Sequence, residues 1–157
     1  MKKIKWPLLL LAIILPFVAA VIGSYFTTPA IPGWYASLNR PFFSPPNWLF
    51  GPVWTALYLM MGLSLYLVWS KKGITFQKPQ TVFYLQLVLN ALWSIVFFGL
   101  TSPGGALFII VLLWLLILYC ILEFRKINLV ASWLLVPYIL WVSFASLLNF
   151  SIWYLNR

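Results

Sequence analysis

The sequence predicts an all-α integral membrane protein, a bundle of five transmembrane helices. The chain of 157 residues is 64% hydrophobic and only 7% charged, whereas soluble domains carry about 25% charged residues. Most of the chain consists of apolar runs of about 20 residues, each long enough to cross a hydrocarbon core of ~30 Å. The alternating segments of a membrane β-barrel do not occur. We therefore expect one membrane domain over residues 1–157.

The five predicted spans follow one another along the chain, at about residues 6–26, 48–69, 80–100, 105–124 and 131–154. Pro16 and Pro137 fall inside the first and last spans. We expect kinks there, because neighbouring helices or water can satisfy the carbonyls that a proline leaves free. The one long connection is a proline-rich segment, 27–47.

The first span also has the basic head, apolar middle and small residues of a secretory signal, which would be cleaved after Ala20. Its apolar stretch exceeds the usual 7–15 residues of such a signal, so we expect an uncleaved helix. The pairs Ala19/Gly23 and Ala20/Ser24 would let another helix approach it closely.

Three spans carry aromatic and polar side chains at helical spacing. These stripes are Trp54, Tyr58 and Met61 in the second span, Gln86, Asn90, Trp93 and Phe97 in the third, and Pro137, Trp141, Ala145 and Asn149 in the fifth. Asn and Gln are costly against lipid, so the stripes should face the interior. Taken alone, they fit either helix packing or a ligand site. The fourth span has no stripe and should be peripheral; it holds Cys120, the only cysteine, so an intramolecular disulfide is excluded.

The basic residues predict the orientation, because cytoplasmic loops retain an excess of Lys and Arg. Lys2, Lys3, Lys5, Lys71, Lys72, Lys78, Arg125 and Lys126 fall on one side of the five spans, and Arg40 and Arg157 on the other. This places the N-terminus in the cytoplasm and the C-terminus outside a cell membrane. Since the net charge of +9 is scattered between the spans, it predicts topology and no nucleic-acid partner.

The residue inventory excludes most chemistry. With no histidine and one acidic residue, Glu123, the chain cannot build a Ser-His-Asp triad, a carboxylate pair or a His-based metal site. A proton relay or voltage sensor also lacks its charged groups. We expect no metal and no cofactor. What remains is ten tryptophans and a few neutral polar residues inside helices.

The run WYASLNRPFFSPPNWLFGPVWTALY at 34–58, followed by LQLVLNALWSIVFFG and WLLVPYILWVSFASLLNF, resembles the TspO/MBR family of tryptophan-rich sensory proteins and mitochondrial translocator proteins. The resemblance covers all five predicted spans. Its most specific parts are the W-Y-x-x-L-x-[KR]-P-x-x-x-P-P core, the P-V-W at the start of the second span, and V-P-Y-x-x-W in the fifth.

The resemblance implies a five-helix bundle, commonly a homodimer, that binds porphyrins such as protoporphyrin IX in a pocket capped by the first connection. In relatives it also implies sterols and benzodiazepine-type drugs. The ligand-binding residues that it implies here are Tyr35, Pro41, Trp54, Tyr58, Asn90, Trp93, Ser94, Trp141, Ala145 and Asn149. Arg40 is a further candidate, because a guanidinium could pair with a porphyrin propionate or, equally, anchor the chain to a lipid phosphate.

One departure concerns sterols. Animal members have a cholesterol-recognition segment with a tyrosine and an arginine where this chain has Phe150 and Tyr154. A loose match at Leu148, Tyr154 and Arg157 is a weak pattern. Sterol binding through that segment is therefore not expected.

Two functional classes stay open, and the first is favoured. One is a porphyrin-binding membrane receptor or sensor. The other is an enzyme that degrades protoporphyrin in light and oxygen, as the resemblance implies, with Trp54 and Trp141 as the oxidisable residues. The absence of acid–base groups permits both. A tetrapyrrole or sterol transporter comes third, because the chain lacks the internal repeats typical of helical transporters.

Overall fold

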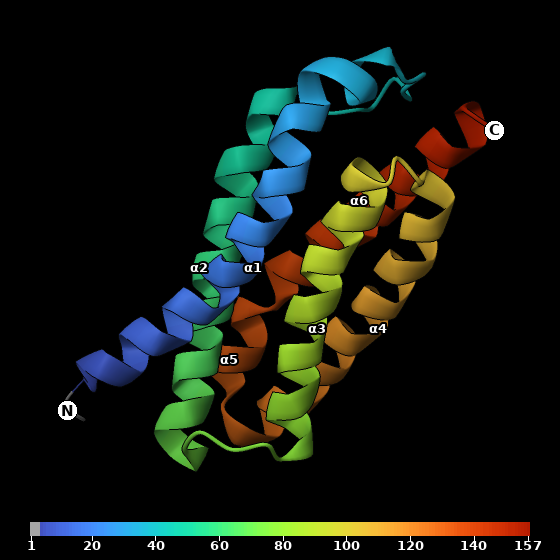
Figure 1. The fold of residues 1–157 in the computed structure, drawn as a ribbon. Coiled ribbons are helices and arrows are strands. Elements are labelled where there is room, and N and C mark those ends of the chain that lie inside the picture. Colours follow the sequence, from blue (N-terminus) through green and yellow to red (C-terminus); the bar gives the residue numbers. More distant parts are fainter. Residues whose placement is uncertain (1–3) are drawn as a thin grey trace.

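The computed structural model describes residues 4–157, so Lys2 and Lys3 lie outside the described part of the chain. It shows a bundle of helices with no strand in the described residues (Figure 1). Five helical segments are long and apolar enough to cross a membrane: Trp6–Tyr35, Asn47–Lys72, Lys78–Gly99, Pro103–Ile127 and Leu129–Leu155. This confirms the predicted fold class of a multi-pass, all-α membrane protein.

The first helix is longer than the sequence predicts. Helix α1 (Trp6–Ala30) continues directly into a π-helical turn, η1 (Ile31–Tyr35), and passes the expected end at residue 26. Pro29 lies inside α1 and Pro32 lies in the first turn of η1. A π turn shifts the hydrogen-bond pattern by one residue, so the prolines bend the helix end without stopping it. The non-helical connection shrinks to 38–46.

The middle helices are α2 (Asn47–Lys72), α3 (Lys78–Ser94), the π-helical η2 (Ile95–Gly99) that extends it, and α4 (Pro103–Ile127). The last span breaks at Leu135 into α5 (Leu129–Leu134) and α6 (Val136–Leu155). Pro137 occupies the first turn of α6, where the missing N–H has no helical partner to lose. The kink predicted at Pro137 is present as this break.

Helix α1 packs on different partners in its two halves. Near the N-terminal half, a Cβ built on Gly62 of α2 would lie 2.7 Å from Ile13 Cα and 3.1 Å from the Ala12 carbonyl oxygen. Pro16 has no N–H to offer that carbonyl, so glycine lets α2 approach the backbone where α1 leaves an acceptor free. This close contact fixes the crossing point of α1 and α2.

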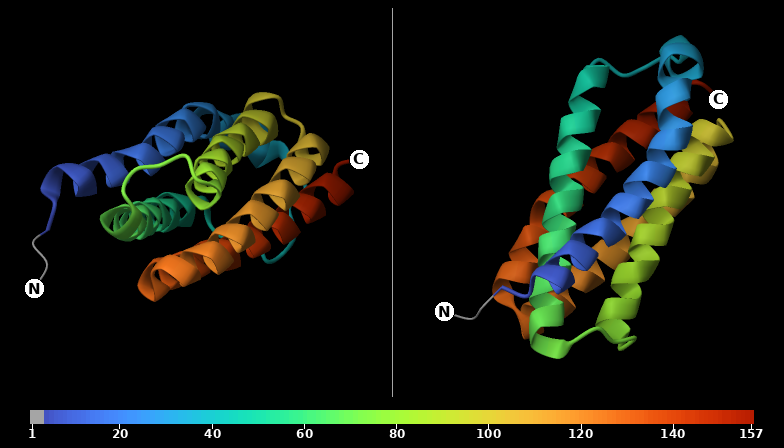
Figure 2. Two further views of the ribbon diagram at one scale, coloured as in Figure 1. Left: turned by 90° about the horizontal axis from the view of Figure 1, so that it is seen from below. Right: turned by 60° about the vertical axis from the view of Figure 1, so that its left-hand side comes forward.

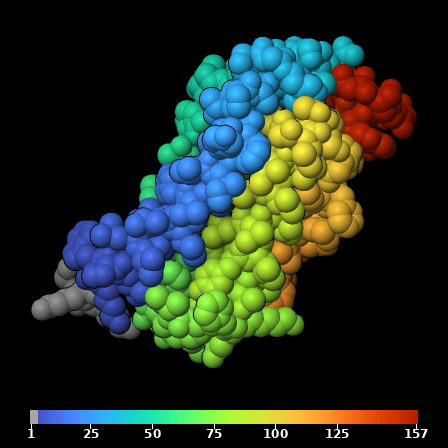
Figure 3. Space-filling model, in the orientation of Figure 1, coloured from blue at the N-terminus to red at the C-terminus, as the bar shows by residue number. Residues whose placement is uncertain are grey.

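The second half of α1 turns away from α2 and leans on the end of the third span. A Cβ on Gly23 would lie 3.1 Å from Ser94 Oγ, and one on Gly99 would lie 2.7 Å from the Phe26 ring. The small residue predicted to permit close approach, Gly23, therefore meets α3. Figure 2 (right) shows α1 and α2 crossing near one end of the bundle and separating toward the other, and Figure 3 shows α1 lying along α3 on this face.

Helix α4 packs against α3 and α6. One face is buried, formed by Ala106, Ile110, Leu113, Ile117, Cys120 and Phe124. Phe108, Val111, Leu115 and Leu122 on other faces of α4 are exposed, as expected for a helix that meets lipid. The structure does not single this span out as peripheral, because α4 is more buried than α1.

The 73–77 connection is held by one buried amide. Gln80 Oε1 accepts hydrogen bonds from Trp69 Nε1 (3.0 Å) and the Thr75 N–H (2.9 Å), and Gln80 Nε2 donates to the Gly73 carbonyl (2.9 Å). Trp69 is only 4% exposed. Its place at a span end suggests an interfacial aromatic, but its indole is used inside the protein.

Candidate functional site

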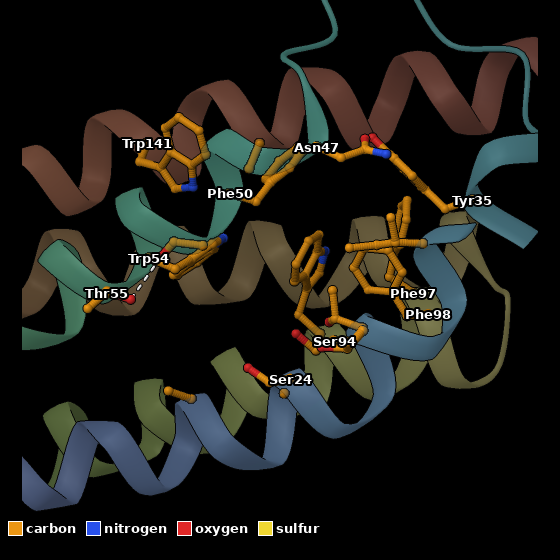
Figure 4. Close-up of a pocket in the computed structure, with 18 of the residues that line it drawn as sticks. Ser24, Tyr35, Asn47, Phe50, Trp54, Thr55, Ser94, Phe97, Phe98 and Trp141 are labelled. Carbon is orange, nitrogen blue, oxygen red and sulfur yellow. Dashed lines mark hydrogen bonds between the residues drawn. The ribbon is translucent and has the colours of Figure 1, made fainter. Parts of the chain in front are cut away.

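A cavity of about 420 Å³ lies in the half of the bundle next to the 38–46 connection. Its walls come from α1 with η1, the first half of α2, the end of α3 with η2, and α6 (Figure 4). It lies within the size range of small-molecule sites in proteins, about 300–1,000 Å³. Helix α4 supplies none of the lining residues in the described chain. The divergence of α1 from α2 creates the space.

The deep end of the cavity is aromatic. Trp54 of α2 stacks on Tyr58, with ring centroids 5.5 Å apart and planes 28° apart. Trp141 of α6 packs at 6.1 Å from Phe50 and 5.5 Å from Phe144. Figure 4 shows Trp141 and Trp54 one above the other at the same end, on facing helices. Such walls suit a flat, apolar ligand.

A buried hydrogen-bond network lies beneath this end. The Tyr58 hydroxyl donates to Asn90 Oδ1 (2.5 Å), Asn90 Nδ2 donates to the Tyr138 hydroxyl (2.9 Å), and Tyr138 donates to Gln86 Oε1 (2.9 Å). These four side chains tie α2, α3 and α6 together. Asn90, Tyr138 and Gln86 are at most 2% exposed and do not line the cavity. The network therefore supports the site from outside.

The side wall is also fixed by paired polar groups. Trp93 Nε1 donates to Asn149 Oδ1 (3.0 Å), and Asn149 Nδ2 donates to the carbonyl of Pro103 at the start of α4 (2.7 Å). The Trp93 ring stacks on Phe97 at 5.4 Å. This wall is preorganised, because its indole N–H and its amide already have partners.

Two donors at the cavity have no partner. The Tyr35 hydroxyl and the Trp141 indole N–H are buried, and neither makes a hydrogen bond within residues 4–157. Both residues line the cavity. Buried polar groups in folded proteins are nearly always hydrogen-bonded, and an indole N–H can only donate. A ligand with hydrogen-bond acceptors would reach these two atoms only after neighbouring side chains shift, because the atoms themselves are buried, and the Arg40 guanidinium already lies beside the Tyr35 hydroxyl.

The 38–46 connection lies next to the cavity but supplies none of its lining residues in the described chain. The Arg40 guanidinium lies 5.3 Å from the centre of the Tyr35 ring and donates to Asn47 Oδ1 at 3.3 Å. The connection is also attached to the C-terminus of α6: the Asn39 N–H donates to Asn156 Oδ1 (3.0 Å), and Asn156 Nδ2 donates to the Asn39 carbonyl (2.9 Å). The connection therefore bridges η1, α2 and α6.

The lining of this site has no charged acid–base group and no metal-binding cluster among the described residues. None of the lining residues of the described chain is acidic or basic. Glu123 pairs with Lys126 at the exposed end of α4, at 2.5 Å. No cluster of three His, Cys, Asp or Glu that could hold a metal exists among residues 4–157.

Comparison with known proteins identifies the chain. The sequence profile of the TspO/MBR family matches residues 12–155. The chain belongs to the TspO/MBR family. This confirms the resemblance read from the tryptophan and proline motifs.

Relatives of this TspO/MBR protein cover most of its length. The tryptophan-rich protein TspO of Archaeoglobus fulgidus is 45% identical over 134 residues, which is 85% of this chain and 87% of that protein. The tryptophan-rich sensory protein of Cereibacter sphaeroides is 36% identical over 149 residues, 92% of each chain. The human translocator protein is 35% identical over 141 residues, 88% of this chain and 83% of that protein.

The structure brings most of the expected TspO/MBR site residues to one cavity. Those that line it are Tyr35, Trp54, Tyr58, Trp93, Ser94, Trp141, Ala145 and Asn149. Three do not: Asn90 lies in the network behind Tyr58, Arg40 contacts the outside of the Tyr35 and Asn47 wall, and Pro41 lies in a separate shallow hollow of the 38–46 connection. Asn90 and Arg40 thus touch lining residues, and Pro41 shapes the connection.

Sequence reasoning missed Tyr138 and the contribution of α1. The buried stripe of α6 runs through Tyr138, Val142, Ala145, Asn149 and Ile152, which alternates steps of three and four residues. The sequence analysis counted only steps of four residues, and so assigned Pro137 and Trp141 to this face and left out Tyr138. Alternating steps of three and four would have included Tyr138. Ser24, Thr27 and Thr28 of α1 also line the cavity; their i, i+3, i+4 spacing puts them on one helix face and could have revealed it.

Proposed function

We propose that this protein is a membrane receptor that binds tetrapyrroles of the protoporphyrin type in the cavity between α1, α2, η2 and α6. Relatives named as a sensory protein and as translocator proteins support a receptor role in the membrane for a TspO/MBR protein. The identity of the ligand is our inference from the site. Binding uses only side chains of this chain, with no cofactor.

The observation that carries the proposal is the pair of unpartnered donors in an aromatic cavity. Trp54 and Trp141 offer indole faces at the deep end, and the Trp141 N–H and Tyr35 hydroxyl await acceptors. A porphyrin combines a flat apolar macrocycle with carboxylates at its edge. Arg40 lies on the outside of Tyr35, and a guanidinium pairs well with a carboxylate.

A second candidate is an enzyme that degrades protoporphyrin in light. It is favoured by the placement of two oxidisable indoles, Trp54 and Trp141, at the same end of the cavity. Light would excite the bound porphyrin, an indole would give it one electron, and dioxygen would take that electron from the reduced porphyrin. The oxidised indole would recover its electron from the porphyrin, so that the net reaction is oxidation of the porphyrin by dioxygen.

The test measures binding and light-dependent loss separately. In the dark, protoporphyrin IX is titrated into purified protein, and the dissociation constant is compared for wild type, Tyr35→Phe and Trp141→Phe. Each change removes a donor that has no internal partner, so we expect about fivefold weaker binding, the worth of one hydrogen bond of ~1 kcal/mol, with unfolding stability unchanged or raised. Unaltered affinity in both variants would refute the proposal.

Trp114→Phe is the matched control. The Trp114 indole donates to Ser143 Oγ (2.8 Å) on the far side of α6 and does not line the cavity, so porphyrin affinity should not change. Under light and air, the Soret band is followed in the same set with Trp54→Phe added. Loss of defined turnover in Trp54→Phe and Trp141→Phe alone would support the enzyme. Equal loss of the Soret band in all variants would exclude the enzyme and leave the receptor as the proposed function.

A further inference from the structure

The cavity has exposed walls on only two helices. Among the lining residues, Ser24 and Thr28 of α1 and Gly51 and Thr55 of α2 are exposed, as is the first turn of α2. The lining residues from α3, η2 and α6 are all buried or half-buried. The cavity is therefore open on one side, between α1 and α2. We call this opening the α1–α2 gap and define its edges by Ser24, Thr28, Gly51 and Thr55.

The gap follows from how α1 is held. Gly62 brings α2 against α1 at Ile13, and the Phe17 and Tyr58 rings still meet at 6.0 Å. Beyond that point α1 is fastened to the third span through Gly23 and Phe26. The two helices therefore separate beyond the Gly62 contact, as Figure 2 (right) shows, while the second half of α1 stays packed against the third span. The gap is therefore a consequence of how α1 packs against both α2 and the third span.

The edge residues of the gap place it within the membrane-spanning lengths of α1 and α2. Thr55 is eight residues into α2, about 12 Å along the axis at 1.5 Å per residue. A hydrocarbon core is ~30 Å thick, so the gap opens within one leaflet. Its outer edge is marked by Trp48, which is 72% exposed, as is typical of an interfacial aromatic. On the side of the 38–46 connection, the Asn39–Asn156 bonds and the contact of Phe43 with Phe144 hold the connection against α6.

We propose that the cavity exchanges its ligand directly with the adjacent lipid leaflet through the α1–α2 gap. The ligand is then an amphiphile already dissolved in the bilayer, with a flat apolar body that slides between the helices. The hydroxyls of Ser24, Thr28 and Thr55 give the edges a weakly polar lining for the polar end of such a molecule. The use of protoporphyrin as a probe below rests on the proposed function, but the gap itself does not.

The kinetic test narrows the gap with a side chain that the structure can accept. A Cβ on Gly51 would have no atom within 4 Å, and the same holds for Gly33. Gly51→Phe adds a ring at the edge of the gap, whereas Gly33→Phe adds the same ring at an exposed site that does not line the cavity. Protoporphyrin IX is supplied in phosphatidylcholine vesicles and mixed with vesicles that contain the protein.

A narrower α1–α2 gap should slow both the entry and the exit of the ligand. In Gly51→Phe we expect both rate constants to fall by about fivefold or more, with their ratio changing less than either, while Gly33→Phe matches wild type. Asn156→Ala, which frees the connection, should leave both rates unchanged. If Asn156→Ala speeds exchange and Gly51→Phe has no effect, ligand passes under the connection and the proposal is overturned. A change in the ratio of the two rate constants, with the rate constant for entry unchanged, also overturns the proposal.

A second measurement needs no porphyrin. In vesicles of phosphatidylcholine with dibrominated acyl chains, bromine quenches tryptophans that lipid tails can reach. The contribution of Trp54 is the difference between each protein and its Trp54→Phe counterpart. We expect this contribution to be quenched in wild type and protected in Gly51→Phe. An unquenched Trp54 in wild type would show that the gap is closed to lipid. Failure of protoporphyrin to bind at all would count against the proposed function and leave this result to decide the gap.

Discussion

The buried polar residues of this TspO/MBR protein fall into two groups with opposite roles. Gln86, Asn90 and Tyr138 have partners inside the bundle, whereas the Tyr35 hydroxyl and the Trp141 indole have none in the described chain. Paired groups hold helices together, because each would be costly if left alone in a low-dielectric interior. Unpaired groups lower the stability of the protein, because burial costs them their hydrogen bonds to water.

Asn90 should matter more for stability than for ligand contact. Asn90→Leu leaves the Tyr58 hydroxyl without its acceptor, so we expect a loss of ~1–3 kcal/mol in the free energy of unfolding, measured by reversible denaturation in detergent micelles. The double variant Tyr58→Phe/Asn90→Leu should recover part of this loss, because both partners are then apolar. If the double variant is as unstable as the sum of the single ones, the hydrogen bond is not the cause.

At the scale of elements, the bundle depends on where α1 touches its neighbours. The sequence pointed to Ala19, Gly23 and Ser24 as a surface for close approach, and Gly23 does meet Ser94. The tighter contact is at Gly62 of α2 against Ile13, which no pattern in the second span singled out. A lone glycine in an apolar helix becomes informative only once its neighbour is known.

Gly62→Ala should therefore weaken the bundle. Its Cβ would lie 2.7 Å from a backbone atom of α1, so the two helices must move apart, at a cost of ~1–3 kcal/mol for an overpacked contact. Gly33→Ala, with open space at its Cβ, should change stability by less than about 0.5 kcal/mol. Thermal unfolding of both variants in micelles gives the comparison, and equal midpoints would show that α1 and α2 adapt freely.

The 38–46 connection offers a test of its attachment to α6. Asn156→Ala removes both hydrogen bonds to Asn39, so backbone amides in the connection, such as that of Ser44, should exchange with deuterium faster while the helices keep their protection. Ser151→Ala on the same helix removes only a bond to the Leu147 carbonyl and should leave the connection unchanged. Exchange that is the same in both variants would mean that other contacts hold the segment.

At the scale of the whole molecule, the charges gather at one end. The connections near Lys5, at 73–77 and at 127–128 lie at the end opposite the C-terminus (Figure 1), and Lys71 Nζ donates to the Ile127 carbonyl there (2.8 Å). Arg40 and Arg157 lie at the other end. This asymmetry keeps the predicted orientation, with the C-terminus outside, as a prediction of the positive-inside rule. A homodimer also stays a prediction.

The orientation is tested with reporters of compartment. A fusion after Arg157 and an insertion in the 73–77 connection should report opposite sides of the membrane, with the insertion in the cytoplasm. An odd number of spans lies between the two sites. A result that places both reporters in the cytoplasm would therefore contradict the five-span topology. A result that places the insertion outside and the C-terminal fusion in the cytoplasm would contradict only the orientation.

The sequence alone determined the class of protein and the five spans, and eight of the eleven site residues that it predicted line the cavity. Those features depend on local quantities: the apolar length of a helix, the repeat that puts Trp54 and Tyr58 on one face, and the motif around Trp34 and Pro41. Helix ends were less certain, since whether a proline stops a helix depends on its surroundings. Pro29 and Pro32 are accommodated by the π turn of η1, which the sequence does not announce.

Only the tertiary structure decided which polar groups are paired and where the cavity opens. In the sequence, Asn90 and Trp141 are both members of a helical stripe. In the structure, Asn90 is hydrogen-bonded to Tyr58 and Tyr138, whereas the Trp141 N–H has no partner in the described chain. The gap arises because Gly62 and Gly23 fasten α1 to two different helices. These outcomes depend on distances between residues far apart in the chain, and such distances are set by the packing of all five spans together.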